Sequence, residues 1–323
     1  MNRWRTCFLA AITAIIAFTL FPWAFYHFPP FADKVRYSAS VLERHKSAIT
    51  IPAALIGGVW ALWIYYRSKE KERAEWLHEL FTSFYLSKDL CQVRMSLEFG
   101  AAELIPLIER VMISPDVTFD ENQRKLLCDL DTSLNYFEFI LHLEERGQLR
   151  TADREAIFKY WYNLINEPTL ASMRMYISRY DYEALAKLVK KTIKYRSKEC
   201  IALYGSLRES DLSKGKPSLE QKLSPIGPCS IPGYLYDLGK YPGLVKGPGI
   251  VTGELYEIVD PTILNELDEY EGFNRTNPNE SLFVRRGVQL TKPVVDCWIY
   301  YYSGEIRPER RIQNGDWIAY KNK

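Results

Sequence analysis

The sequence predicts two membrane-spanning helices, then an all-α helical bundle, then a β-rich domain with one short helix. Two uncharged apolar runs near the N-terminus predict the membrane helices. Apolar residues at three- and four-residue steps predict the bundle, and short alternating runs broken by Gly and Pro predict the strands. We therefore divide the 323 residues into an anchor (1–67), a helical domain (68–195) and a C-terminal domain (196–323).

The two uncharged runs cover residues 6–26 and residues 47–66. Each is long enough to cross a hydrocarbon core of about 30 Å as a helix, and Trp and Tyr residues flank both. A cleaved signal peptide is the alternative for the first run, but residues 23–26 lack a small-x-small cleavage pattern. Both runs are therefore predicted to contact the lipid bilayer.

Basic residues set the expected orientation of this anchor. Two spans place both termini on one side of the membrane, where six basic residues flank the spans (Arg3, Arg5, Arg67, Lys69, Lys71 and Arg73). The intervening loop carries four (Lys34, Arg36, Arg44 and Lys46). The positive-inside rule thus predicts a multi-pass inner-membrane protein with its C-terminal domain in the cytoplasm.

Residues 68–195 have the periodicity of helices but no catalytic motif. Thr118-x-x-Glu121 resembles a capping box, and Gly147 is a plausible helix end. Three glutamates near His142 form no Glu-x-x-His pair, so a solvated helix face is preferred to a metal site. We expect this domain to supply no catalytic group. A basic linker is predicted at residues 190–198.

The C-terminal domain is predicted to contain five strands and one helix. The apolar or alternating runs are residues 201–204, 233–238, 250–258, 282–290 and 294–302. In the helix, Asp260 is the expected cap, Pro261 occupies the first turn and Gly272 ends it. Residues 207–224 are interpreted as a loop that borders the site.

Composition excludes several kinds of chemistry. There are 42 Lys and Arg against 40 Asp and Glu, and a net charge of +2 is too small to indicate nucleic-acid binding. The six cysteines include no Cys-x-x-Cys pair, which predicts neither a disulfide framework nor a zinc site. All four histidines precede residue 143, and no Walker loop is present. The prediction is that no cofactor and no metal are needed.

The candidate binding site is the stretch Tyr204, Gly205, Ser206 and Leu207. An apolar strand stops there at a Gly-Ser pair, and a glycine allows a sharp turn that leaves N–H groups facing outwards. Such N–H groups suit a carboxylate or a developing oxyanion. Because the domain has no histidine, Ser206 is not predicted to be a nucleophile, and Tyr204 is interpreted as a packing residue.

The candidate catalytic residue is Glu271, at the end of the predicted helix beside Tyr270 and close to Phe273. An aromatic setting removes water from a carboxylate and raises its pKa toward the range useful for proton transfer. The alternative is an ordinary solvated glutamate at a helix end. Asp268 and Glu269 are interpreted as surface residues of the same helix.

Several motifs occur in one order across residues 200 to 320. They are Tyr204-Gly205-Ser206-Leu207, Gly233 to Gly239 leading to Tyr241-Pro242-Gly243, Val251-x-Gly253-Glu254-Leu255-Tyr256, Leu267-Asp268-x-x-Glu271-Gly272-Phe273, Trp298-x-Tyr300 and Gly315-Asp316-Trp317. In these the domain resembles the gamma-glutamylcyclotransferase-like family, in particular its gamma-glutamylamine cyclotransferase branch. The resemblance implies a mixed β-barrel-like α+β fold, residues 204–207 as the substrate cradle and Glu271 as acid and base.

The resemblance also implies the reaction and the substrate class. A membrane-anchored enzyme of this type would cyclise a gamma-glutamyl amine or peptide to 5-oxoproline and release the amine. This chain departs from the family at Phe283, where members often carry Tyr, and in residues 207–224. The main alternative is a non-catalytic sensor of a gamma-glutamyl ligand, coupled to the membrane helices, and a third is an anchored structural protein with an inert domain.

Overall fold

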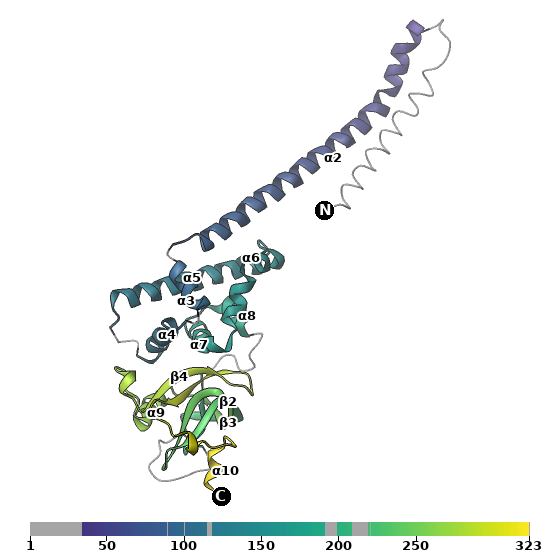
Figure 1. Cartoon of the computed structure of the whole chain (residues 1–323). Coiled ribbons are helices and arrows are strands. Elements are labelled where there is room, and N and C mark those ends of the chain that lie inside the picture. The colour runs from purple at the N-terminus through teal and green to yellow at the C-terminus, as the bar shows by residue number, and fades with distance from the viewer. Residues whose placement is uncertain are drawn as a thin grey trace. The chain divides into compact units, whose positions relative to one another are not determined.

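The computed structural model describes residues 34–322, except residues 89, 100, 115–117, 191–198, 209–218 and 220, with side chains from residue 50 onward other than residue 190 (Figure 1). The chain divides into two compact units, residues 1–80 and residues 81–323, which are described separately. The predicted linker and much of the predicted loop at 207–224 lie outside the described residues.

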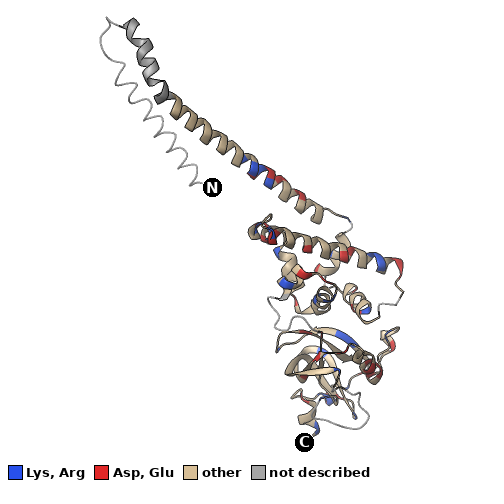
Figure 2. Ribbon diagram, turned by 180° about the vertical axis from the view of Figure 1, so that it is seen from behind, with Lys and Arg blue, Asp and Glu red and all other residues tan. Residues whose placement is uncertain are grey.

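Helix α2 (Lys34–Tyr85) contains the second predicted membrane span. Among the described residues, no helix combines the length and the apolarity that crossing a membrane requires. Pro52 lies inside α2, and from Arg67 onward the helix carries Lys, Arg and Glu side chains, the blue and red bands near its C-terminal end in Figure 2. The large apolar side chains of this stretch are exposed.

This finding corrects the predicted anchor. Residues 47–66 do not qualify as a span, and residues 6–26 lie outside the described residues. The two-helix anchor, the bilayer as a partner and the inner-membrane location with a cytoplasmic C-terminal domain were all derived from the two runs together. These predictions are therefore wrong on this finding.

The helical region, defined here as residues 81–190, confirms the predicted helices. Its helices are α3 (Cys91–Glu98), α4 (Leu104–Ile113), α5 (Glu121–Glu145), α6 (Thr151–Ile165), η1 (Pro168–Leu170), α7 (Ala171–Arg179) and α8 (Glu183–Lys190). Phe84 is 1% exposed and packs among aromatic rings that include Phe137 and Phe158. These rings form the core that the apolar spacing predicts.

Two local predictions in the helical region need correction. The capping box of α5 joins Asp120 and Gln123 rather than Thr118 and Glu121, because the Asp120 carboxylate accepts from the Gln123 N–H at 2.8 Å. Glu138 is not on a solvated face, since its two oxygens accept from the Ala184 and Leu185 N–H groups in the first turn of α8, each at 2.8 Å. A glutamate placed there caps a helix N-terminus.

The C-terminal domain is α+β, as predicted, and its strands form one five-stranded sheet. The remaining elements are β1 (Cys200–Leu203), β2 (Leu223–Asp237), β3 (Pro242–Ile258), α9 (Ile263–Glu271), η2 (Pro278–Glu280), β4 (Phe283–Gln289), β5 (Asp296–Tyr302), η3 (Pro308–Arg310) and α10 (Trp317–Lys321). The strand order is β2-β3-β1-β5-β4. Only the β1–β5 pair is parallel, so the sheet is mixed. Strands β2 and β4 are its edges, and an isolated antiparallel bridge between Ser230 and Lys292 joins β2 to the segment that follows β4.

Strand β2 begins at Leu223, before the predicted run 233–238. The sequence pattern missed its first part because that part carries three prolines (Pro225, Pro228 and Pro232). Proline lacks a backbone N–H, which an edge strand tolerates, and two irregularities in the β2–β3 register accommodate these residues. The lengthened β2–β3 hairpin brings Lys240, Tyr241 and Pro242 to the end of β1. This placement forms one wall of the cavity described below.

Gly315, in the Gly-Asp-Trp motif, is required by a close backbone approach. It has a φ of +63°, and its carbonyl accepts from the Thr252 N–H at 2.8 Å. A Cβ at this position would collide with the backbone carbonyl oxygen of Ile250. The motif therefore fastens the C-terminal segment to β3.

We expect Gly315→Ala to lower the free energy of unfolding by about 3 kcal/mol, since left-handed strain and overpacking add. The matched control is Gly272→Ala, which has a φ of +67° but meets no atom closer than 3.9 Å. Strain alone should cost this control about 1–2 kcal/mol. Equal shifts of the two thermal unfolding midpoints would contradict the account of Gly315.

Candidate active site

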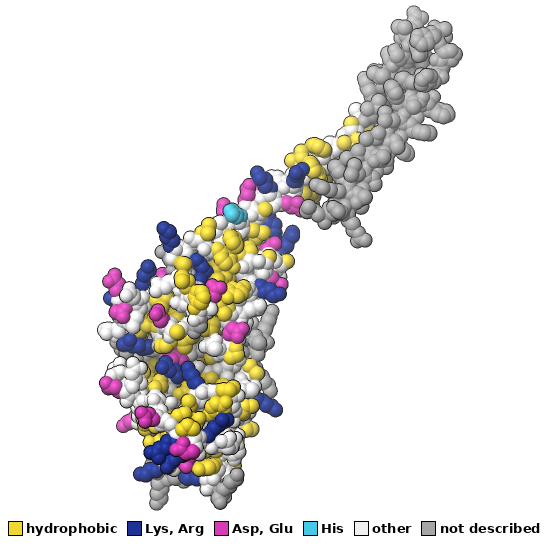
Figure 3. Space-filling model, in the orientation of Figure 1, with side chains coloured by type: hydrophobic (Ala, Val, Ile, Leu, Met, Phe, Trp, Pro, Cys, Tyr) yellow, Lys and Arg dark blue, Asp and Glu magenta, His cyan; other side chains and the backbone are white. Residues whose placement is uncertain are grey.

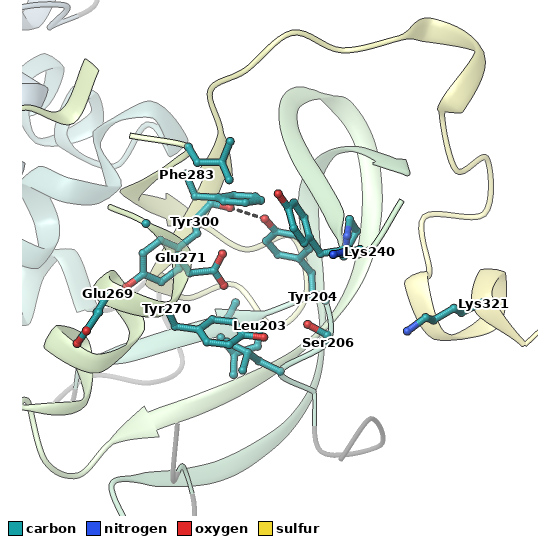
Figure 4. A pocket seen from close by; sticks show the side chains of 17 residues that line it. Leu203, Tyr204, Ser206, Lys240, Glu269, Tyr270, Glu271, Phe283, Tyr300 and Lys321 are labelled. Atoms are coloured by element: carbon teal, nitrogen blue, oxygen red, sulfur yellow. Dashed lines mark hydrogen bonds between the residues drawn. The ribbon is translucent and has the colours of Figure 1, made fainter. Parts of the chain in front are cut away.

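A cavity of about 470 Å³ opens where β1 ends (Figure 4). Five segments supply its walls: β1 with the turn after it, the β2–β3 hairpin, the end of α9, the β4–β5 hairpin and α10. All the site residues predicted from the sequence line this cavity: Tyr204, Gly205, Ser206, Leu207 and Glu271. A cavity of this size suits a small molecule or short peptide.

Glu271 is the last residue of α9, and Gly272 ends the helix in a left-handed conformation, as predicted. The Glu271 carboxylate points into the cavity, whereas Glu269 points away from it (Figure 4). Ile263, Leu264 and Leu267 of α9 are buried and anchor the helix in the core of the domain. Glu271 is thus the carboxylate of α9 that points into the cavity.

Burial raises the pKa of Glu271 from 4.5 to about 7. The cause is loss of water around the carboxylate, although the residue keeps partial contact with solvent through the cavity. Within the described part of the chain, no hydrogen bond or ion pair is made by this carboxylate. A group in this state can both accept and return a proton near neutral pH.

Asp268, one helical turn earlier, has the opposite environment. It is 3% exposed, so its interpretation as a surface residue is wrong. Its carboxylate accepts from the Tyr300 hydroxyl at 2.6 Å and from Arg275 Nε at 2.6 Å, and Arg285 lies 3.4 Å away. The negative charge of Asp268 is therefore balanced by Arg275 and Arg285, and its hydrogen bond to Tyr300 links α9 to β5. Glu271 has no such partner among the described residues and remains available for proton transfer.

Tyr204 is a packing residue, as predicted. It is 7% exposed, and its hydroxyl donates to the Tyr300 carbonyl oxygen at 2.7 Å, the dashed line in Figure 4. Burial, and then the negative charge of Glu271, raise the pKa of the Tyr204 hydroxyl well above its usual value. It is consequently a poor proton donor.

The turn after Tyr204 differs from the predicted one in its geometry. Gly205 does not have a positive φ; glycine is favoured because a Cβ would lie 3.1 Å from Pro242 Cγ. The N–H groups of Gly205 and Leu207 donate to no described residue. Arg208 then anchors the turn through Glu254 at 3.2 Å and Asp316 at 3.0 Å.

The cavity is also lined by residues to which sequence reasoning gave no role in the site, among them Lys240, Phe283, Tyr300 and Lys321. Phe283 and Tyr300 were noted in motifs but given no place in the site. Lys240 and Lys321 carry no sequence signal at all, and they lie on the Ser206 side, away from Glu269 (Figure 4). Their positions depend on long-range folding of the hairpin and α10.

No metal-binding arrangement was found in the described chain: nowhere in it do three His, Cys, Asp or Glu side chains gather so as to hold an ion. The visible face of the molecule mixes side chains of both charge signs rather than presenting one basic surface (Figure 3). The chemistry of the cavity must therefore be argued from Glu271, the backbone N–H groups and the two lysines.

The fold and site define an α+β domain with a cavity centred on one desolvated carboxylate. The family described as gamma-glutamyl cyclotransferase, AIG2-like, matches residues 201–319. The gamma-glutamylcyclotransferase family protein YtfP of Escherichia coli (strain K12) is 37% identical over 119 residues, which are 36% of this chain and 95% of that protein. The chain therefore belongs to the gamma-glutamylcyclotransferase family through this domain.

Two further relatives are similar to the same domain. The gamma-L-glutamyl-butirosin B gamma-glutamyl cyclotransferase of Niallia circulans is 33% identical over 128 residues, covering 37% of this chain and 75% of that protein. The solution NMR structure of ytfP from Escherichia coli is 34% identical, with a TM-score of 0.29, and the match covers 38% of this chain and 98% of that chain.

The raised pKa of Glu271 predicts a pH-dependent stability. Between pH 4.5 and about 7 the folded protein holds a proton that the unfolded chain has lost. The free energy of unfolding should therefore fall as pH rises through this window, by on the order of 2 kcal/mol. Glu271→Gln should remove this contribution when urea unfolding is measured at several pH values.

The control for this measurement is Glu269→Gln, because Glu269 is exposed on the same helix. Its pH dependence should match that of the wild type. If Glu271→Gln and the wild type keep a constant difference in unfolding free energy from pH 4.5 to 8, Glu271 is solvated and the assignment of its environment is wrong.

Proposed function

We propose that this domain cyclises a gamma-glutamyl amine or peptide to 5-oxoproline and releases the attached amine. The observation that carries the proposal is Glu271, a desolvated carboxylate that faces a cavity and has no hydrogen-bond or ion-pair partner among the described residues. The Gly205 and Leu207 N–H groups, which donate to no described residue, belong to the same cavity lining. Membership of the gamma-glutamylcyclotransferase family supports the same reaction class.

In the proposed reaction the nucleophile belongs to the substrate. Its α-amine nitrogen attacks its own side-chain carbonyl carbon and forms the new C–N bond of a five-membered lactam. Glu271 takes a proton from the attacking nitrogen and returns it to the leaving nitrogen as the original C–N bond breaks. Atoms and charges balance without water, cofactor or an enzyme nucleophile, which agrees with a domain that lacks histidine.

The cavity supplies the two other requirements of this reaction. Holding the substrate curled converts the attack into a well-oriented intramolecular step, which can remove about 7–11 kcal/mol of the barrier. The N–H groups of Gly205 and Leu207, on residues that line the cavity, are proposed to hold the oxyanion or the substrate carboxylate. The Lys240 ammonium, on the same side, adds positive charge for a carboxylate.

Glu271→Gln keeps the side-chain volume but cannot accept a proton. We expect kcat to fall by about 10²-fold or more while ligand binding persists, because only proton transfer is lost. The wild-type enzyme should show an acidic limb in kcat/KM with an apparent pKa near 7, and Glu269→Gln should keep both rate and profile. Turnover of Glu271→Gln at the wild-type rate would exclude Glu271 as the acid and base.

Substitutions at Gly205 test the binding turn by graded size. Gly205→Ala places a Cβ 3.1 Å from Pro242, a tight but adjustable contact, whereas Gly205→Val forces the turn away from the hairpin. We expect KM to rise in the order Gly, Ala, Val, with a smaller change in kcat. An unchanged KM for Gly205→Val would show that the turn does not hold the substrate.

A further inference from the structure

A buried carboxylate of the helical region binds the edge of the cyclotransferase sheet. Glu109, on α4, is 2% exposed. It accepts from Arg286 at 2.7 Å and from the Gly287 N–H at 3.0 Å, both on the edge strand β4, and from Ser172 Oγ on α7 at 2.7 Å. An edge strand carries unpaired N–H groups, so Glu109 satisfies one that would otherwise be available to another chain.

A second buried ion pair joins the helical region to β5. Arg174, on α7, is 1% exposed, and its guanidinium makes two parallel hydrogen bonds to Asp296, at 2.8 and 2.7 Å. The same guanidinium donates to the carbonyl oxygens of Ile165 and Glu167. Two-point pairing of this kind fixes orientation as well as distance.

The helical region and the C-terminal domain are also in close backbone contact. Helix α7 packs on β4 and β5, and a Cβ on Gly287 would overlap Ser172. The absence of a side chain at Gly287 thus lets the helix backbone sit against the strand. Charge, hydrogen bonding and shape all match at this contact.

The β4–β5 hairpin held in this way is also a wall of the active site. Phe283 begins β4 and Tyr300 lies in β5, and both line the cavity. Tyr300 further donates to Asp268 on α9, which ends in Glu271. A displacement of the hairpin would therefore be passed to the cavity wall and to the catalytic helix.

We propose that the helical region is a positioning module for the active site, with Glu109 and Arg174 as the positioning residues. None of the described residues of the helical region lines the cavity, so its proposed contribution is indirect. The Escherichia coli relative is matched over 95% of its length and has no room for a counterpart, so this contact is an addition to the domain. This positioning role is separate from the reaction proposed for the cavity.

The test uses the full chain and hydrogen–deuterium exchange, which does not depend on the proposed reaction. Glu109→Gln should raise the exchange of β4 and also of the pocket segments 204–208 and 263–272, by roughly 10-fold, at temperatures well below unfolding. In a gamma-glutamyl substrate assay, kcat/KM should fall about 10-fold. Glu103→Gln, an exposed residue just before α4, is the matched control and should change neither.

A second variant keeps the test decisive if Glu109→Gln folds poorly. Arg286→Gln removes the charge partner at a residue that can still reach solvent, since its side chain is 31% exposed. The two changes act through one contact, so the double variant should lose no more than the larger single one. Faster exchange confined to α4 and β4, with pocket segments and kcat/KM at wild-type values, would overturn the proposal.

Discussion

The proposed chemistry of this domain depends on the desolvated carboxylate of Glu271, which has no positively charged partner among the described residues. The neighbouring carboxylate, Asp268, does have such partners. Desolvation of Glu271 costs free energy, and the surrounding structure must hold it in place. The neighbouring Asp268 does this: with Tyr300 and Arg275 it fastens α9 to the sheet, so that only Glu271 faces the cavity. Two carboxylates one turn apart on a helix thus have separate roles, one structural and one proposed to move protons.

The second element of the site, the turn after β1, depends on a different constraint. Gly205 is close to Pro242, and Arg208 is held between Glu254 and Asp316, so the turn is fixed at both ends. Its N–H groups can then point at a ligand without a cost of ordering when the ligand binds. The cavity therefore combines a rigid anion-binding turn with a carboxylate of raised pKa.

Local signals predicted the site better than they predicted the fold around it. Glu271 could be found because the helix end, Gly272 and the aromatic neighbours are adjacent in sequence. The burial of Asp268 could not, because it depends on Tyr300 and on Arg285, which are distant in sequence. The barrel-like sheet was implied by the family resemblance, and the observed five-stranded order could not be read from the sequence because single-segment patterns do not report strand pairing. The apolar runs were predicted as membrane spans because each run was considered without the rest of its helix.

The central claim is intramolecular cyclisation, and the most direct measurement is product analysis by mass spectrometry in ¹⁸O-labelled water. The full chain, incubated with gamma-glutamyl amines and peptides, should release the free amine and an equal amount of 5-oxoproline that contains no ¹⁸O. Labelled glutamate as the product would mean hydrolysis instead. Binding of a gamma-glutamyl compound with no release of 5-oxoproline would contradict the claim and favour a sensor.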